Sequence, residues 1–163
     1  MPHIAFIGLG SNLEDPSGQL QRAFTELDRL PGTRLVARSS LYRGAPLGYQ
    51  DQPEFVNAVA KIATALTPQA LLQTLLAIER KHGRERTFRN APRTLDLDVL
   101  LYDDMQLHEH GLSIPHPQMH LRAFVLQPLL EIAPDCVIPG IGRAEQALCG
   151  CLDQTLEKFL DTV

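Results

Sequence analysis

The feature that most constrains the fold is a strict alternation of apolar and acidic residues in the middle of the chain. From Leu95 the sequence reads LDLDV, and a period of two is typical of a β-strand with one face in a core. The apolar residues then point to one side, and Asp96 and Asp98 point to the other. Two like charges on one strand face repel each other, so the pair requires a positive partner. We therefore predict a strand over Leu95–Tyr102 whose acidic face binds divalent cations, with Mg²⁺ as the natural candidate.

A basic segment directly precedes this strand. From Arg80 to Arg93 the chain has six basic residues and one acidic residue, whereas its formal net charge is −4. The planar guanidinium group of arginine binds phosphate oxygens in pairs and stays charged at physiological pH. Because the positive charge is local, the pattern favours a compact polyanion over nucleic acid. For the arginines taken alone, a solvated charged loop after a helix is the alternative interpretation.

The composition is that of one soluble globular domain. Hydrophobic residues make up 44% and charged residues 21% of the 163 residues, which is ordinary for a domain of this size. The start, MPHIAFIGLGSN, lacks a basic segment and resembles a first strand more than a signal peptide. We therefore expect one domain over residues 1–163, a monomer in the cytoplasm that contacts no membrane.

The order of elements predicts the architecture. We expect strands over His3–Leu9, Thr33–Tyr42, Phe55–Ala65 and Leu95–Tyr102, and helices that begin at Asp15–Pro16 and Thr67–Pro68. The order βαββαβ predicts an α+β fold, a ferredoxin-like sandwich with an antiparallel sheet, helices on one face and the other face free for ligands. A C-terminal helical extension should follow, with a short helix near 121–131 and an amphipathic tail helix that includes Leu148, Leu152, Leu156 and Phe159.

Two common nucleotide-binding motifs are missing. Gly8 and Gly10 begin a G-x-G, but Leu13 replaces the third glycine, and no GxxxxGK[ST] loop occurs. Phosphates would therefore be held by side chains and metal, a sufficient basis for phosphoryl transfer, whose barrier falls mainly through positioning and charge neutralisation.

One strand also offers a surface for a flat ring. Phe55 and Asn57 share a face, so a ring could stack on Phe55 while the Asn57 amide donates and accepts hydrogen bonds at its edge. The alternative is a core phenylalanine beside an asparagine at a strand end.

Several longer strings carry a resemblance to a known family. They are GLGSN, SSLYRGAPLG, QPEFVNA, PRTLDLDVLLY and IPHPQMHLRAFVLQPLLEIAPD, which lie between residues 8 and 135. Together they resemble the 6-hydroxymethyl-7,8-dihydropterin pyrophosphokinases of folate biosynthesis. The resemblance implies transfer of the intact β,γ-pyrophosphoryl group of ATP to the hydroxymethyl group of the pterin, with two Mg²⁺ ions.

The resemblance also implies roles for individual residues. Asp96 and Asp98 match the metal ligands, and together with Arg84 and Arg93 they form the implied catalytic set. The implied ATP contacts are Glu79, Arg84, Arg86, Arg93, Val99, Ser113, His116 and Arg122. The implied pterin contacts are Gly44, Pro46, Leu47, Phe55, Asn57 and Phe124, with the two phenylalanines sandwiching the ring. Asn90 departs from the family, because many relatives carry an aromatic residue at that point of the catalytic loop.

Two further function classes remain as alternatives. Ferredoxin-like sheets can bind RNA through exposed aromatic residues, but this chain is only 6% aromatic, has a negative net charge and contains no RNP-like string. A metal-dependent phosphohydrolase would share the aspartates but would have no use for Phe55 and Asn57. We therefore expect ATP and the pterin as small-molecule partners, and no nucleic acid.

Overall fold

The computed structural model describes residues 2–12, 15–44, 55–82, 95–154 and 156–158. Within them, a six-stranded sheet has the order β10 (Glu157–Lys158), β3 (Tyr42–Gly44), β4 (Phe55–Thr64), β1 (His3–Ser11) and β5 (Leu95–Tyr102), and β2 (Thr33–Arg38) also pairs with β4. All of these pairings are antiparallel. The long strands therefore agree with the prediction, and Leu95–Tyr102 has the predicted bounds.

The predicted strand over Thr33–Tyr42 is divided in two. β2 ends at Arg38 and β3 begins at Tyr42. At the break, the backbone of Ser39 donates to the Val59 carbonyl, and the Ser39 side chain accepts from the Val59 N–H at 2.9 Å. Because a side chain takes the place of a backbone carbonyl, the ladder is interrupted while the buried polar groups of Val59 stay satisfied.

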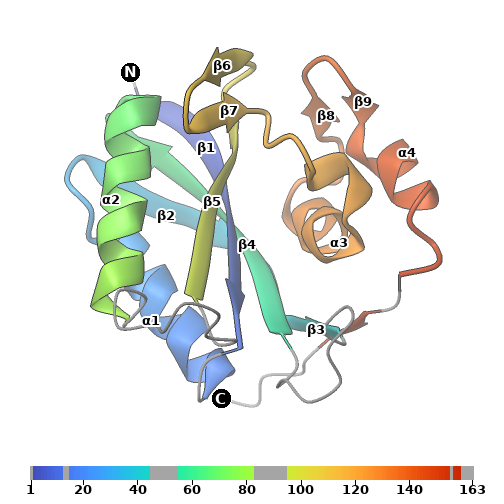
Figure 1. Ribbon diagram of the computed structural model, residues 1–163, viewed down its shortest axis with the longest axis horizontal. Coiled ribbons are helices and arrows are strands. Elements are labelled where there is room, and N and C mark those ends of the chain that lie inside the picture. Colours follow the sequence, from blue (N-terminus) through green and yellow to red (C-terminus); the bar gives the residue numbers. More distant parts are fainter. Residues whose placement is uncertain (1, 13–14, 45–54, 83–94, 155, 159–163) are drawn as a thin grey trace.

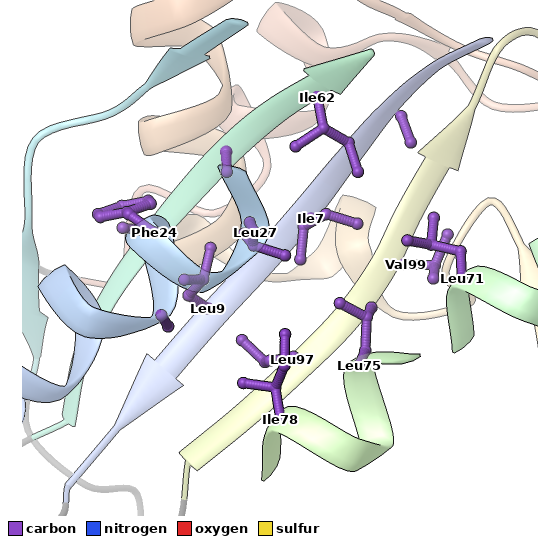
Figure 2. Packing of buried hydrophobic residues seen from close by; sticks show 14 of the residues in the cluster. Ile7, Leu9, Phe24, Leu27, Ile62, Leu71, Leu75, Ile78, Leu97 and Val99 are labelled. Atoms are coloured by element: carbon purple, nitrogen blue, oxygen red, sulfur yellow. The ribbon is translucent and has the colours of Figure 1, made fainter. Parts of the chain in front are cut away.

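Two helices cover one face of the sheet, as predicted. α1 (Pro16–Asp28) begins at Asp15, whose side chain accepts from the Gly18 N–H, and α2 (Pro68–Lys81) begins at Thr67, whose side chain accepts from Ala70. Both helices have proline in the first turn, a position where proline sacrifices no hydrogen bond. Their apolar residues, which include Leu27, Leu71 and Leu75, pack on alternate residues of the central strands (Figure 2), which include Ile7, Leu9, Leu97 and Val99.

The prediction that the whole second face is free is wrong, because a helix covers the part of it around Val59 and Leu100. α3 (Ala123–Ile132) and η2 (Met119–Leu121) lie on that side (Figure 1), and Leu126 and Leu129 form a buried cluster with Val59 and Leu100 of the sheet. The helix has the sequence AFVLQPLLEI, which is apolar on more than one side, so it needs partners in two directions. It packs against β4 and also against α4 (Ala144–Cys149).

The predicted amphipathic tail helix is also wrong. α4 ends after six residues, Leu152 is 78% exposed, and the chain returns to the sheet as β10, which pairs with β3. The physical reason lies in Gln154, whose side chain accepts from the Ala123 N–H at 2.9 Å and donates to the Leu121 carbonyl at 2.9 Å. These bonds hold the chain against the start of α3 in place of a helical turn.

The remaining elements are small hairpins. β6 (Leu107–Glu109) pairs with β7 (Leu112–Ile114), and β8 (Val137–Ile138) pairs with β9 (Gly142–Arg143). Among the described helices, none is both long and apolar enough to cross a membrane.

Candidate active site

The paired aspartates lie on the second face of the sheet. Along β5, Leu95 and Leu97 are buried while Asp96 and Asp98 are half-buried, which is the predicted alternation. Leu95 and Leu97 belong to the core under α2, so the two carboxyl groups point away from that core. The carboxylates therefore share one face, as a cation site requires.

The strand register places the Asp96 carboxylate in a row with Asn57. Gly10 of β1 pairs with Asp96 on one side and with Asn57 of β4 on the other. Directly paired residues share a face, so the row runs Asp96, Gly10, Asn57. Two strand spacings separate its ends, about 10 Å. The structure thus brings together the predicted metal ligand and the predicted pterin-edge residue.

Glycine at position 10 gives the Asn57 side chain the space for this arrangement. A Cβ atom at Gly10 would stand 2.7 Å from the Asn57 side-chain oxygen, a distance that real Cβ atoms do not show. The Asn57 amide therefore lies against the bare backbone of Gly10, and the middle of the row has no side chain. Gly8 and Gly10 therefore form no nucleotide-binding loop. Instead they lie within β1, where Gly10 leaves space beside Asn57. This role can be recognised only when the strand register is known.

The residues predicted to stack on the pterin come from two elements. Phe55 begins β4, is half-buried and pairs with Gly44 of β3. Phe124 lies in the first turn of α3, also half-buried, and the Arg122 guanidinium lies over its ring at 5.5 Å from the centroid. Pro46 and Leu47 lie outside the described residues.

A cavity of about 300 Å³ adjoins the outer edge of β5. Four predicted site residues line it, Asp98, Val99, Ser113 and His116, together with Leu72, Leu97, Gly111, Leu112 and Pro117. The cavity therefore begins at the face that carries Asp98 and extends toward α2 and the β6–β7 hairpin, a region of mixed polar and apolar lining that suits a nucleoside.

His116 is held as a neutral hydrogen-bond donor. Burial lowers the pKa of its imidazole, and the charge of Arg122 lowers it further, although Asp98 acts in the opposite direction. Its Nδ1 accepts from the Gln118 N–H at 3.1 Å. In the neutral ring the proton is then on Nε2, so His116 can donate to an oxygen of a ligand.

Glu79 lies on the opposite side of β5 from the aspartates. It is 5% exposed, and its Oε2 accepts from the backbone N–H of Leu97 at 2.7 Å. Leu97 stands between Asp96 and Asp98, so this buried carboxylate fixes the segment of backbone that carries them. The implied contact between Glu79 and ATP stays a prediction.

The described residues fit a magnesium site that the nucleotide would complete. Mg²⁺ is commonly bound by one or two carboxylates together with substrate phosphates and water. The Asp96 and Asp98 pair provides such a set, and no group of three or more His, Cys, Asp or Glu side chains occurs in the described part of the chain. Arg84, Arg86 and Arg93, predicted to bind the phosphates, lie outside the described residues.

Comparison with known proteins identifies the family of the chain. The model of the 7,8-dihydro-6-hydroxymethylpterin-pyrophosphokinase (HPPK) family matches residues 6–134. A 2-amino-4-hydroxy-6-hydroxymethyldihydropteridine pyrophosphokinase of Pseudomonas aeruginosa is 47% identical over 154 residues, covering 94% of this chain and 95% of its own. The Haemophilus influenzae protein of the same name is 52% identical over 136 residues, covering 83% of this chain and 85% of its own.

Solved structures share the fold at low identity. Plasmodium falciparum HPPK-DHPS with pteroate has a TM-score of 0.73 at 13% identity, over 94% of this chain and 43% of that chain. HPPK-DHPS in complex with substrates has a TM-score of 0.74 at 12% identity, over 93% and 44%. This chain thus spans less than half the length of those two proteins, and the likeness concerns the fold. On the family match and the close relatives, the chain belongs to the 7,8-dihydro-6-hydroxymethylpterin-pyrophosphokinase family.

Proposed function

We propose that this protein transfers the intact β,γ-pyrophosphoryl group of ATP to the hydroxymethyl group of 6-hydroxymethyl-7,8-dihydropterin. The products are AMP and the pterin diphosphate, and the reaction is a step of folate biosynthesis. The observation that carries the proposal is the row Asp96, Gly10, Asn57 on one sheet face. It supports a metal-bound phosphate chain at the Asp96 end and a flat heterocycle at the Asn57 end. Gly10, between them, has no side chain.

The pterin end of the site is formed by the edge of β4 and the start of α3. Asn57 is 8% exposed, and a buried amide gains most from a ligand that both donates and accepts hydrogen bonds. The amino and carbonyl edge of a pterin is such a ligand. Phe55 and Phe124 would stack on its two ring faces, and Gly44, Pro46 and Leu47 would provide backbone around it.

The phosphate end is formed by Asp96 and Asp98, which would hold two Mg²⁺ ions. Bound Mg²⁺ supplies charge neutralisation on the phosphates that are transferred. The arginines Arg84, Arg86 and Arg93 would bind the same phosphates, and Arg84 and Arg93 would stabilise the charge that develops during transfer. Together these groups direct the phosphate chain toward the pterin end of the row.

The nucleoside of ATP would occupy the cavity at the edge of β5. Val99 and Ser113 line it, and His116 also lines it with a donor on Nε2. Arg122 and Glu79 complete the proposed ATP-binding set. Since the cavity shares Asp98 with the metal face, one ATP molecule could fill the cavity and present its phosphates to the metal.

The same proposal extends to the architecture. With β2 and β3 taken as one interrupted strand, the sheet order supports a ferredoxin-like topology. We propose that residues 1–163 form a single domain that acts as a monomer in the cytoplasm.

The nucleotide product tests the proposed function. Purified protein is incubated with Mg²⁺, ATP and the hydroxymethyl-dihydropterin, and the nucleotides are separated by chromatography. AMP that forms only when the pterin is present supports pyrophosphoryl transfer. ADP would reject it in favour of an ordinary kinase, and phosphate released without pterin would indicate a phosphohydrolase.

A further inference from the structure

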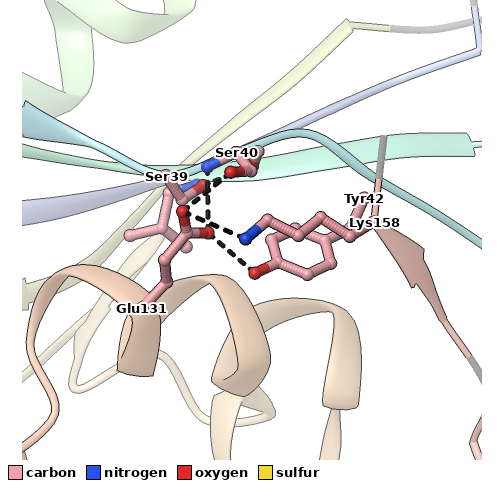
Figure 3. Close-up of polar contacts among 6 residues, drawn as sticks. Ser39, Ser40, Tyr42, Glu131 and Lys158 are labelled. Atoms are coloured by element: carbon pink, nitrogen blue, oxygen red, sulfur yellow. Dashed lines mark hydrogen bonds and ion pairs between the residues drawn. The ribbon is translucent and has the colours of Figure 1, made fainter. Parts of the chain in front are cut away.

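Glu131, in the last turn of α3, contacts two segments that are distant from it in sequence, one with Ser40 and Tyr42 and one with Lys158. Its Oε1 accepts from the Ser40 N–H at 3.0 Å and from the Tyr42 hydroxyl at 2.7 Å, and its Oε2 accepts from the Ser40 hydroxyl at 2.7 Å. The Lys158 ammonium lies 3.9 Å from Oε2. Figure 3 shows these groups converging on one carboxylate from the β2–β3 connection, β3 and β10.

The strand that Glu131 holds is the one that borders the proposed pterin site. β3 has only three residues, and they pair with Phe55, Val56 and Asn57 of β4. In particular Tyr42 pairs with Asn57, so the Tyr42 ring, which is 3% exposed, flanks the Asn57 amide on the side opposite Gly10. A strand this short depends on contacts outside its own ladder to stay in place.

The helix that carries Glu131 also carries the other wall of that site. Phe124 and Glu131 are seven residues apart in α3, nearly two full turns, so they project from the same side of the helix. One wall therefore consists of Phe124, and the other consists of Phe55 and Asn57. The bond between Glu131 and Tyr42 therefore links the helix that carries one wall to the strand that pairs with the other.

The polar bonds of Glu131 outweigh the partial desolvation of its carboxylate, whose side chain is 28% exposed. Burial alone would raise the pKa of this carboxyl, but hydrogen bonds from Tyr42 and Ser40 and the charge of Lys158 hold the pKa below its ordinary value. Burial and the same bond to Glu131 raise the pKa of Tyr42. Glu131 is thus an ionised acceptor and Tyr42 a permanent donor at neutral pH, and charge-assisted bonds of this kind are the strong ones.

We propose that Glu131 is a positioning residue for pterin binding, which sets the separation of the two walls by holding Tyr42 against α3. This inference rests on the proposed function and adds a residue that touches neither substrate. Because the ATP cavity lies at the other edge of the sheet, along β5, the effect should fall on the pterin and spare the nucleotide.

The test compares ligand affinities across four variants, measured by calorimetry with a hydroxymethyl-pterin and, separately, with a non-hydrolysable ATP analogue and Mg²⁺. Glu131→Ala should weaken pterin binding about tenfold, which corresponds to one hydrogen bond to a charged group. Tyr42→Phe removes only the hydroxyl group and should weaken it in the same direction. Glu131→Gln keeps an acceptor oxygen and should restore much of the affinity. The ATP analogue should bind all of them as it binds the wild type.

Glu157→Gln is the matched control. Glu157 also bonds to β3, through Arg43 at 3.1 Å, but its side chain is 71% exposed and the bond does not involve Tyr42. The Glu157→Gln substitution should leave the affinities for the pterin and for the ATP analogue unchanged.

The results distinguish a failure of the positioning role of Glu131 from a failure of the proposed function. Wild-type pterin affinity in Glu131→Ala and Tyr42→Phe, or equal weakening of pterin and nucleotide, would overturn the positioning role, even if thermal stability falls. Should Glu131→Ala fail to fold, Tyr42→Phe alone decides between these results. A wild-type protein that binds no pterin would reject the proposed function itself, and this inference with it.

Discussion

Replacing Gly10 by alanine should damage pterin binding while leaving the protein folded. The backbone of Gly10 does not have the positive φ that demands glycine, and alanine is favoured over glycine inside a strand by about 0.5–1 kcal/mol. The new Cβ would stand 2.7 Å from the Asn57 side-chain oxygen. That oxygen must therefore shift or rotate, and Tyr42, paired with Asn57 on the far side, restricts where it can go.

The magnitude follows from the hydrogen bonds that Asn57 would lose. An amide turned away from the pterin edge gives up one donated and one accepted bond, each worth about 1 kcal/mol net. The sum of about 2 kcal/mol corresponds to a pterin dissociation constant that is roughly 30-fold larger. Calorimetric titration of Gly10→Ala with the pterin measures this directly.

Gly8→Ala is the natural comparison, because it makes the same change two residues earlier on the same strand face. Its Cβ would meet the Leu100 side chain at 3.2 Å, so it should cost about 1 kcal/mol of packing and leave the Asn57 amide in place. If Gly10→Ala binds the pterin as tightly as Gly8→Ala does, the assignment of Asn57 to the pterin edge is refuted.

Three further predictions concern the acidic residues. Asp96→Asn or Asp98→Asn should abolish turnover but keep the wild-type thermal unfolding, because each removes a proposed metal ligand from a face outside the α2 core; turnover at the wild-type rate would contradict the metal assignment. Glu79→Ala leaves the buried Leu97 N–H without this acceptor, so urea unfolding should show a loss of about 1–3 kcal/mol; unchanged stability would show that Glu79 does not anchor β5. The Glu131 pKa lies below its ordinary value of 4.5, so its stabilising effect is complete above that pH and is lost as pH falls through the folded-state pKa. Unfolding followed across acidic pH should therefore be less pH-dependent in Glu131→Gln, and identical slopes would contradict this.

Local signals were enough to predict the framework. Asp15 and Thr67 each precede a proline, and a side-chain cap followed by proline defines a helix start without help from the rest of the chain. The alternation from Leu95 likewise defines a strand and its two faces. For the same reason the shared face of Asp96 and Asp98 was predictable from five consecutive residues.

What could not be predicted depends on contacts between distant segments. The break after Arg38 depends on Ser39 replacing a backbone acceptor for Val59, and the end of the tail depends on Gln154 bonding to the start of α3. Neither has a local signal, because serine and glutamine occur in many loops without such partners. A helix near 121–131 was predicted and is present as α3. Its position on the second face of the sheet was not predicted, because a segment that is apolar on all sides does not reveal which surface it will cover.

For the site too, local sequence predicted some features, and others depend on contacts between distant segments. The residue types at its ends, Asp96 and Asn57, were predicted from strand periodicity, but their alignment through Gly10 follows from the register of three strands. Register is decided by the whole sheet. The link from Tyr42 to Glu131 joins residues 89 positions apart, so only the folded chain reveals it.

We propose that the site transfers two phosphoryl units of ATP together to the pterin. The most direct test follows the fate of each phosphorus, with ATP radiolabelled at the β position in one reaction and at the γ position in another. We predict that both labels enter the pterin product in equal amounts, one of each per AMP formed. A pterin product that carries only the γ label would contradict the account.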